Sequence, residues 1–370
     1  MKKVLVVACM ILLLVTSCGQ PPITSELLSY IDRKGHHRPV MTGSDWKKKR
    51  SQMLDSLQAV MGALPSLKSL PAFDIQYRDS LKETHYTRYL ITFTVADNEY
   101  LPAYLYIPAR RTAQRKYPAM LALHPTGDIG KKIVDGEGKP YRAYAKELAR
   151  RGYVVIAPDY PSFGELSDYD FQNDRYGSGT MKGIFDHIRC VDLLQSMPEV
   201  DPECIGVIGH SLGGHNALFV GAFDTRLKIV VSSCGWTAFE YYDIGPVAEE
   251  RYGGRLGPWA QDRYMPLLRD KYRLDGDQIP FNFHEIIALI APRWFFSCSP
   301  VNDSNFDVAG VKIGIDKAMD AYRFLKADDR IQVRYPMAEH DFPNEIRKEV
   351  YRFIDDIFNH QPDDPDWLAD

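Results

Sequence analysis

The sequence predicts an α/β protein with a mostly parallel central sheet flanked by helices. From residue 117 onward, short apolar runs alternate with longer segments of helical character, which is typical of strands joined by helical crossovers. Within this alternation, IGVIGHSLGGHNALF (205–219) places a buried strand, a glycine-rich turn and a helix in direct succession. The chain has 370 residues, of which 45% are hydrophobic and 25% charged. This length and composition predict one large domain with appendages.

The first 43 residues precede the expected domain. Residues 1–17, MKKVLVVACMILLLVTS, combine two lysines, a short apolar run and small residues before Cys18. The run is too short to cross a bilayer as a helix, and the pattern resembles a bacterial lipoprotein signal peptide. We therefore expect cleavage before Cys18, lipidation of that cysteine, and export to the periplasmic or cell-surface side of a bacterial membrane. Residues 18–43 are polar and contain prolines, which predicts a tether.

Charge and cysteine content limit the partners. Removal of residues 1–17 takes away two lysines and no acid, so the formal charge changes from −4 to −6. This mild acidity argues against a nucleic-acid partner, and the lipid anchor is the only membrane contact we expect. Besides Cys9 and Cys18 the chain has four cysteines, too few for a disulfide framework, so buried thiols are expected. A bridge between Cys234 and Cys298 stays open, as does the oligomeric state.

A helix and a hairpin open the domain. Ser44 and Asp45 can cap a helix over 46–61, whose apolar residues share one face. Residues 84–96 and 100–107 alternate apolar and polar side chains around an Asp-Asn turn, which predicts an antiparallel hairpin. Buried strands are then expected at 118–123, 153–157, from 205, 227–233, 294–297 and 331–335, with helices that include 141–151, 181–196 and 345–358.

One segment interrupts the alternation. Residues 235–283 follow the sixth expected strand and are rich in aromatic residues, glycine and proline. We expect them to lie over the glycine-rich turn as a cap. The aromatic side chains can form a satellite core or the wall of a substrate pocket, and both hypotheses stay open. Trp236, Tyr241 and Trp259 are the candidates for substrate contact.

The turn GHSLG predicts a nucleophile at Ser211. Gly209 and Gly213 permit a sharp turn that leaves the Ser211 hydroxyl exposed at the end of the strand. The helix that follows directs backbone N–H groups and the positive end of its dipole toward the serine. The alternative is a glycine-rich turn with an incidental surface serine.

A catalytic serine needs a base and an acid that orients the base. In an open α/β sheet the active groups lie beyond the carboxyl ends of the strands. The loop after the last expected strand carries His340, and the loop after the preceding strand carries Asp303. The resulting chain order of serine, aspartate and histidine is the order expected for this type of turn. Asp307 and Glu240 stay open as alternatives to Asp303.

Two backbone amides are predicted to stabilise a tetrahedral intermediate. Leu212 directly follows the nucleophile. The second donor should come from the loop after the strand at 118–123. Pro125 has no N–H, so Thr126 is the expected donor and Gly127 the alternative.

The other histidines near the turn are expected to pack or to contact substrate. His210 lies in the turn and is a candidate substrate contact, whereas His215 lies on the helix. His284 has no second histidine at the spacing of a zinc-binding helix. We therefore expect neither a metal site nor a cofactor.

These motifs together resemble those of α/β-hydrolases, and more narrowly the dienelactone-hydrolase and acetyl-xylan-esterase-like branch among bacterial secreted proteins. The matching stretches are LHPTGDIGK (123–131), APDYPSFGE (157–165), VDPECIGVIGHSLGGHNALF (200–219), PFNFHEIIALIAPRW (280–294), SPVNDSNFD (299–307), EHDFP (339–343) and the helix that ends in MGALP. The resemblance implies an α/β-hydrolase domain over 44–370 with its cap after the sixth strand. It also implies a triad of Ser211, Asp303 and His340 that hydrolyses a carboxyl ester, often one that decorates a polysaccharide. The GHSLG turn differs from the Cys-Ser-Arg turn of glucuronoyl esterases, although HEIIALIAPR is similar to theirs.

Three functions follow as hypotheses. The leading one is a lipid-anchored serine esterase that forms an acyl-enzyme with a polysaccharide ester or a related small ester. A serine peptidase of the prolyl-oligopeptidase type has a similar catalytic domain, but the stretch before residue 44 is too short for its propeller. A hydrolase-fold binding protein without catalysis is the third, although every position that the chemistry needs is filled.

Overall fold

The computed structural model describes residues 25–109 and 116–368. The expected signal peptide over 1–17 and the expected lipidation site Cys18 lie outside the described residues. None of the helices in the described ranges combines the length and apolar character that crossing a membrane requires.

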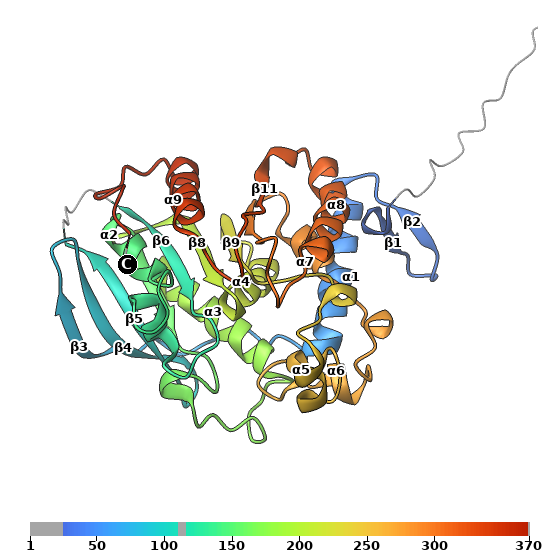
Figure 1. The fold of residues 1–370 in the computed structure, drawn as a ribbon, viewed down its shortest axis with the longest axis horizontal. Helices are drawn as coiled ribbons and strands as arrows, with labels where there is room; N and C mark the ends of the chain where they lie inside the picture. Colours follow the sequence, from blue (N-terminus) through green and yellow to red (C-terminus); the bar gives the residue numbers. More distant parts are fainter. Residues whose placement is uncertain (1–24, 110–115, 369–370) are drawn as a thin grey trace, which may run out of the picture.

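A nine-stranded sheet forms the centre of the described chain (Figure 1), in the order β11-β10-β9-β8-β6-β7-β5-β4-β3. Within this sheet, β3, β4 and β5 pair antiparallel in succession, and β5 also pairs antiparallel with β7. The six strands from β6 to β11 pair parallel with one another. The strands are β3 (Gln76–Lys82), β4 (Tyr86–Ala96), β5 (Glu99–Pro108), β6 (Tyr117–Leu123), β7 (Val154–Pro158), β8 (Val200–His210), β9 (Ile229–Ser233), β10 (Trp294–Cys298) and β11 (Ile331–Arg334). The predicted mostly parallel sheet is therefore confirmed.

Helices bury both faces of this sheet. Leu121 of β6 belongs to a core shared with α1, α3, α4, α7 and α8, whereas its neighbours Met120 and Ala122 belong to a core shared with α2 and α9. Burial on both faces explains why this strand is a continuous apolar run without alternation. The helices named here are α1 (Gly43–Met61), α2 (Tyr144–Arg150), α3 (Gly179–Ser196), α4 (Leu212–Phe223), α7 (Phe283–Ile290), α8 (Val308–Phe324) and α9 (Asn344–Phe358).

The segment before α1 is folded onto the domain. β1 (Ser29–Ile31) and β2 (His37–Pro39) form a small antiparallel hairpin. Leu27 and Val40 flank it, and they belong to the larger core with only 1% and 4% of their surface exposed. Residues 25–42, expected as part of a tether, are thus a folded extension of the body.

The start of α1 differs from the expected one. The N-cap is Thr42, whose side chain accepts from the Asp45 backbone N–H, while the Asp45 carboxylate accepts from the Thr42 backbone. This reciprocal capping box starts the helix at Gly43, so the proposed caps Ser44 and Asp45 lie inside its first turn. The helix ends at Met61, as expected.

The cap segment after β9 contains α5 (Pro246–Tyr252), α6 (Leu267–Asp270) and several short 3₁₀ turns. Its two α-helices lie together near one end of α1 (Figure 1). Most of its aromatic side chains are buried in the core that includes α4 and α7, among them Trp236, Phe239, Tyr242 and Trp259. Most of these aromatic residues therefore serve packing, but they extend the larger core and do not form the separate satellite core that was one of the two hypotheses.

Candidate active site

The turn between β8 and α4 holds Ser211 in a strained conformation. Its backbone has φ 55° and ψ −123°, a region that residues with a side chain rarely occupy. A Cβ atom on Gly209 would lie 2.1 Å from the carbonyl oxygen of Gly213, and one on Gly213 would lie 1.9 Å from that of Leu123. The two flanking glycines are therefore required by close backbone contacts, as the G-x-S-x-G pattern predicted.

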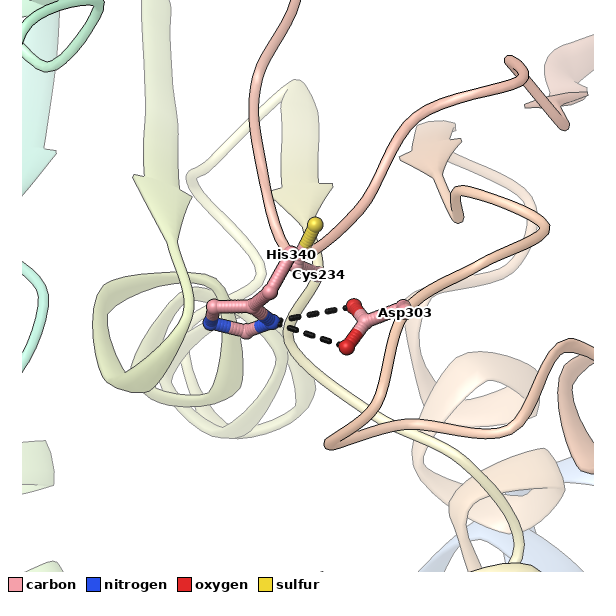
Figure 2. Close-up of side chains that lie close together, drawn as sticks. All are labelled: Cys234, Asp303 and His340. Atoms are coloured by element: carbon pink, nitrogen blue, oxygen red, sulfur yellow. Dashed lines mark hydrogen bonds and ion pairs between the residues drawn. The ribbon is translucent and has the colours of Figure 1, made fainter.

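Three loops at the carboxyl edge of the sheet bring Ser211, His340 and Asp303 together. The Ser211 Oγ lies 2.8 Å from His340 Nε2. On the other side of the ring, Nδ1 lies 2.9 Å and 3.0 Å from the two carboxylate oxygens of Asp303 (Figure 2). Because an ionised carboxylate only accepts hydrogen bonds, Nδ1 carries the imidazole proton and Nε2 is left to accept the serine proton.

Asp303 is fixed by its own loop. One carboxylate oxygen also accepts the backbone N–H groups of Asn305 and Phe306, at 2.8 Å and 3.2 Å. The two alternative acids have other partners. Asp307 caps α8 by accepting from Ala309 N–H at 2.7 Å, and Glu240 accepts from the Asn282 side chain at 2.8 Å.

The two predicted amide donors lie beside the serine. Leu212 is the first residue of α4, where helical geometry leaves the N–H without an intrahelical partner. Thr126 and Gly127 line a pocket of about 280 Å³ together with Ser211 and His340. The site thus combines an activated hydroxyl with N–H groups at a helix N-terminus, which suits the negative charge of a tetrahedral intermediate.

A buried ionic network anchors the loop that carries Thr126. The Asp159 carboxylate, which follows β7, accepts from the Lys131 backbone N–H at 2.8 Å and from Lys131 Nζ at 2.5 Å. It also accepts from Glu165 N–H at 3.0 Å, and Lys131 Nζ donates to Glu165 at 2.6 Å. Cβ atoms on Gly130 and Gly164 would lie 2.1 Å and 2.2 Å from Asp159 Oδ1, so the carboxylate is enclosed between the two loops.

Aromatic contacts anchor the same loop from a second side. The ring of Tyr160 stacks on that of His124 at a centroid distance of 3.8 Å, and its hydroxyl donates to the His124 carbonyl at 2.8 Å. From the cap, the Tyr264 hydroxyl hydrogen-bonds the Thr126 side chain. These supporting residues were not predicted from the sequence. The available signal was that Asp159 and Tyr160 directly follow a buried strand at the active edge.

The candidate substrate contacts have different positions. His210 lines the pocket, but its ring is buried and its Nδ1 lies 3.0 Å from Ser233 Oγ. Trp236 is buried, donates from its indole nitrogen to Ser297 at 3.1 Å and is not among the described residues that line the pocket, so its contact with substrate stays a prediction. Tyr241 packs against Gly310 of α8, and the ring of Trp259 stacks on that of His215 with 4.0 Å between the ring centroids. The described lining of the pocket includes neither of these two aromatic residues.

Buried histidines around the site have lowered pKa values. Burial lowers the pKa of His215 to about 3 and that of His284 to about 4, with the positive charge of Lys317 adding to the effect on His284. Burial also lowers the pKa of His210 well below its ordinary value, and the charges of Arg142, His340 and Lys139 act in the same direction. These rings are therefore neutral near pH 7.

Cys234 lies next to the Asp303–His340 pair (Figure 2), and atoms of the three side chains come within 4.8 Å of one another. The donor types are ones that zinc accepts. However, burial raises the pKa of the Cys234 thiol well above its ordinary value, and the thiol donates to the Asp341 carbonyl at 3.1 Å. The triad hydrogen bonds already engage the other two groups, so the arrangement fits a protonated thiol better than a metal ligand.

Four cysteines lie in the described ranges, and they are all free thiols. Cys190, Cys234 and Cys298 are buried and Cys204 is partly exposed. The bridge between Cys234 and Cys298 that the sequence left open is therefore not formed in this structure.

Sequence comparisons relate the chain to esterases. Residues 101–243 match the dienelactone hydrolase family, and residues 175–324 match the family described as "Glucuronyl esterase, fungi". The putative hydrolase YtaP of Bacillus subtilis is 28% identical over 318 residues, which cover 82% of this chain and 98% of YtaP. Carbohydrate esterase MZ0003, from an unknown prokaryotic organism, is 27% identical over 54% of this chain and 47% of its own length.

Comparison with solved structures establishes the fold. A glucuronoyl esterase from Solibacter usitatus superposes with a TM-score of 0.66 at 19% identity, covering 90% of this chain and 98% of that one. The chain therefore has the α/β-hydrolase fold that the sequence predicted.

Proposed function

We propose that this protein is a serine carboxyl-ester hydrolase that acts on esters carried by carbohydrates. The observation that carries the proposal is the continuous hydrogen-bonded chain from Ser211 through His340 to Asp303 at a strained strand-to-helix turn. The matches to the dienelactone hydrolase family and to the fungal glucuronyl esterase family support the ester part of the proposal, and the similarity to a carbohydrate esterase supports the carbohydrate part.

In this mechanism His340 Nε2 removes the Ser211 proton as Oγ attacks the ester carbonyl. The N–H groups of Leu212 and Thr126 stabilise the oxyanion, and Asp303 stabilises the imidazolium. His340 then gives the proton to the leaving alcohol, and an acyl-enzyme remains on Ser211. Water, activated by the same imidazole, releases the acid and restores the serine.

The decisive experiment compares the parent protein with Ser211→Ala. Both are incubated with 4-nitrophenyl acetate and, separately, with acetylated xylan, methyl-esterified pectin and feruloylated arabinoxylan, and the released acid or alcohol is identified. We expect release by the parent and a loss of about 10³-fold or more in kcat for the variant. Undiminished turnover by the variant would remove Ser211 from the mechanism. The absence of turnover in the parent would favour a binding protein.

We also propose that the protein is exported and anchored by a lipid on Cys18. The basic, apolar and small-residue pattern of residues 1–18 supports this proposal. Metabolic labelling with a radioactive fatty acid should mark the full-length protein and should not mark the Cys18→Ala variant. Equal labelling of both would contradict a lipid on this cysteine.

A further inference from the structure

The pocket beside Ser211 is lined by two cations, Lys139 and Arg142, and its described lining contains no carboxylate. This is not a consequence of the overall composition, because the chain carries a formal charge of −4. The N-terminus of α4 points its positive dipole end at the same place. The positive potential of the pocket thus favours a negatively charged group on the ligand, in addition to the transient oxyanion.

The two cations have different roles. Arg142 is buried; its guanidinium is ion-paired with the Asp341 carboxylate and donates to the His340 carbonyl at 3.3 Å. It therefore ties the wall of the pocket to the loop of the catalytic histidine. Lys139 is exposed and has neither an ion pair nor a hydrogen bond among the described residues. Its ammonium group is the one that a ligand can reach and neutralise.

A second hollow shows where the anion belongs. A groove of about 970 Å³ adjoins the pocket and shares Lys139, Arg142 and His340 with it. Its lining also includes the acidic residues Glu339 and Asp341. An anion is therefore disfavoured in the outer groove and favoured in the inner pocket, whose lining contains Lys139 and no carboxylate.

We propose that the substrate carries a free carboxylate, or an anion of similar charge, next to its scissile ester, and that Lys139 pairs with it inside the pocket. This inference rests on the proposed function. The carboxylate is separate from the ester group that reacts. It can belong to the acyl part or to the alcohol part of the substrate, and Lys139 is a specificity-determining residue in either case.

Two matched pairs of esters distinguish a carboxylate on the alcohol part from one on the acyl part. 3-Carboxyphenyl acetate against 3-carbamoylphenyl acetate places the charge on the alcohol, and phenyl hydrogen glutarate against phenyl pentanoate places it on the acid. For the parent we expect kcat/KM about 5-fold to 10-fold higher for the charged member of at least one pair, as for a partly shielded ion pair. The preference should weaken as NaCl rises from about 0.05 M to about 0.5 M.

Variants test the assignment to Lys139. Lys139→Gln should bring the charged-to-neutral ratio close to one, and Lys139→Glu should invert it. Lys132→Gln, an exposed lysine of the same segment outside the pocket lining, is the control and should keep the parent ratio. A parent without preference in both pairs, or a Lys139→Gln variant with the parent ratio, would overturn the proposal. Failure of the proposed function is distinguishable, because hydrolysis of the neutral esters would then not depend on Ser211.

Discussion

At the scale of single residues, the site concentrates backbone strain at Ser211. A φ near 55° at a residue that carries a side chain costs on the order of 1–3 kcal/mol of folding free energy, so the surrounding structure must stabilise this backbone conformation. Here the backbone N–H of Ser211 donates to the Ser233 carbonyl at 2.8 Å, and the Ser211 carbonyl accepts from His215 N–H at 2.9 Å. The strain thus places the hydroxyl toward the imidazole while both backbone groups stay paired.

Asp303→Asn tests the acid of the triad. An amide presents N–H groups as well as an oxygen to the imidazole and cannot stabilise an imidazolium. We expect kcat on 4-nitrophenyl acetate to fall by about 10³-fold to 10⁴-fold near pH 7 with KM changed less than about 3-fold, the pattern of serine-protease triads. Unfolding in urea should show that the variant remains folded.

The two other acids provide matched controls. Glu240→Gln and Asp307→Asn remove the same charge from carboxylates bonded to Asn282 and to the start of α8. Each should keep kcat within about 3-fold of the parent, because substitutions of surface residues usually have only small effects on a folded protein. A loss in either control equal to that of Asp303→Asn would mean that Asp303 is not the acid.

At the scale of elements, the ionic network around Asp159 connects the loops after β6 and β7. Asp159→Asn leaves Lys131, whose side chain is 2% exposed, without its buried counter-ion. Breaking a buried pair in this way costs about 3–5 kcal/mol of unfolding free energy. We expect kcat to fall as well, because the Thr126 amide belongs to the loop that is released.

Urea denaturation and kcat measured on the same Asp159→Asn sample check this prediction. Glu165→Gln is the control, since Glu165 is 38% exposed and also contacts the exposed Arg78. Its loss of stability should be clearly smaller. Equal stability of the parent and Asp159→Asn would show that the network does not hold these loops.

The segment before α1 makes a second prediction for an element. Leu27→Ala removes a side chain that is 1% exposed in the main core, so it should cost about 2–4 kcal/mol of unfolding free energy. Ile31→Ala changes a side chain that is 49% exposed and should cost less than about 0.5 kcal/mol. If both variants unfold at the parent urea concentration, the segment is a tether after all.

The elements differ in how well the sequence predicted them. The parallel strands and the serine turn were predicted because burial on both faces and tight backbone contacts leave a clear pattern. β3 was missed because all its side chains are exposed and its sequence, QYRDSLK, does not alternate regularly. The hairpin before α1 was taken for a tether because its folding depends on two flanking apolar residues, Leu27 and Val40.

The site shows the same division. Ser211, Asp303 and His340 could be predicted because each follows a strand at the same edge of the sheet. Arg142 could not, because it acts on the site through contacts with another loop. Asp159 also follows such a strand, but its supporting role depends on a contact with another loop and could not be predicted. The partner of Arg142 at Asp341 lies 199 residues along the chain, and that of Asp159 at Lys131 lies 28 residues away. No local pattern encodes such contacts.

At the scale of the whole molecule, buried neutral histidines link stability to pH. Burial lowers the pKa of His124 to about 4 and that of His187 to about 3, from 6.5 in the unfolded chain. Below pH 6.5 the unfolded chain therefore binds protons that the folded chain does not, so the unfolding free energy falls as pH falls toward these values. Two carboxyl groups oppose this trend, because burial raises the pKa of Asp186 to about 6 and raises that of Glu285 above its ordinary value, but several buried histidines act against them.

His187→Phe isolates one member of this group. His187 is buried, and neither ring nitrogen has a hydrogen-bond partner among the described residues, so a phenyl ring leaves no partner unpaired. Urea denaturation across pH 8 to about pH 4.5 should show a shallower loss of stability in the variant. Well below pH 6.5, the difference in slope should approach one proton, about 1.4 kcal/mol per pH unit. A parent slope in His187→Phe would mean that this ring takes up its proton without unfolding, and that burial does not keep it neutral.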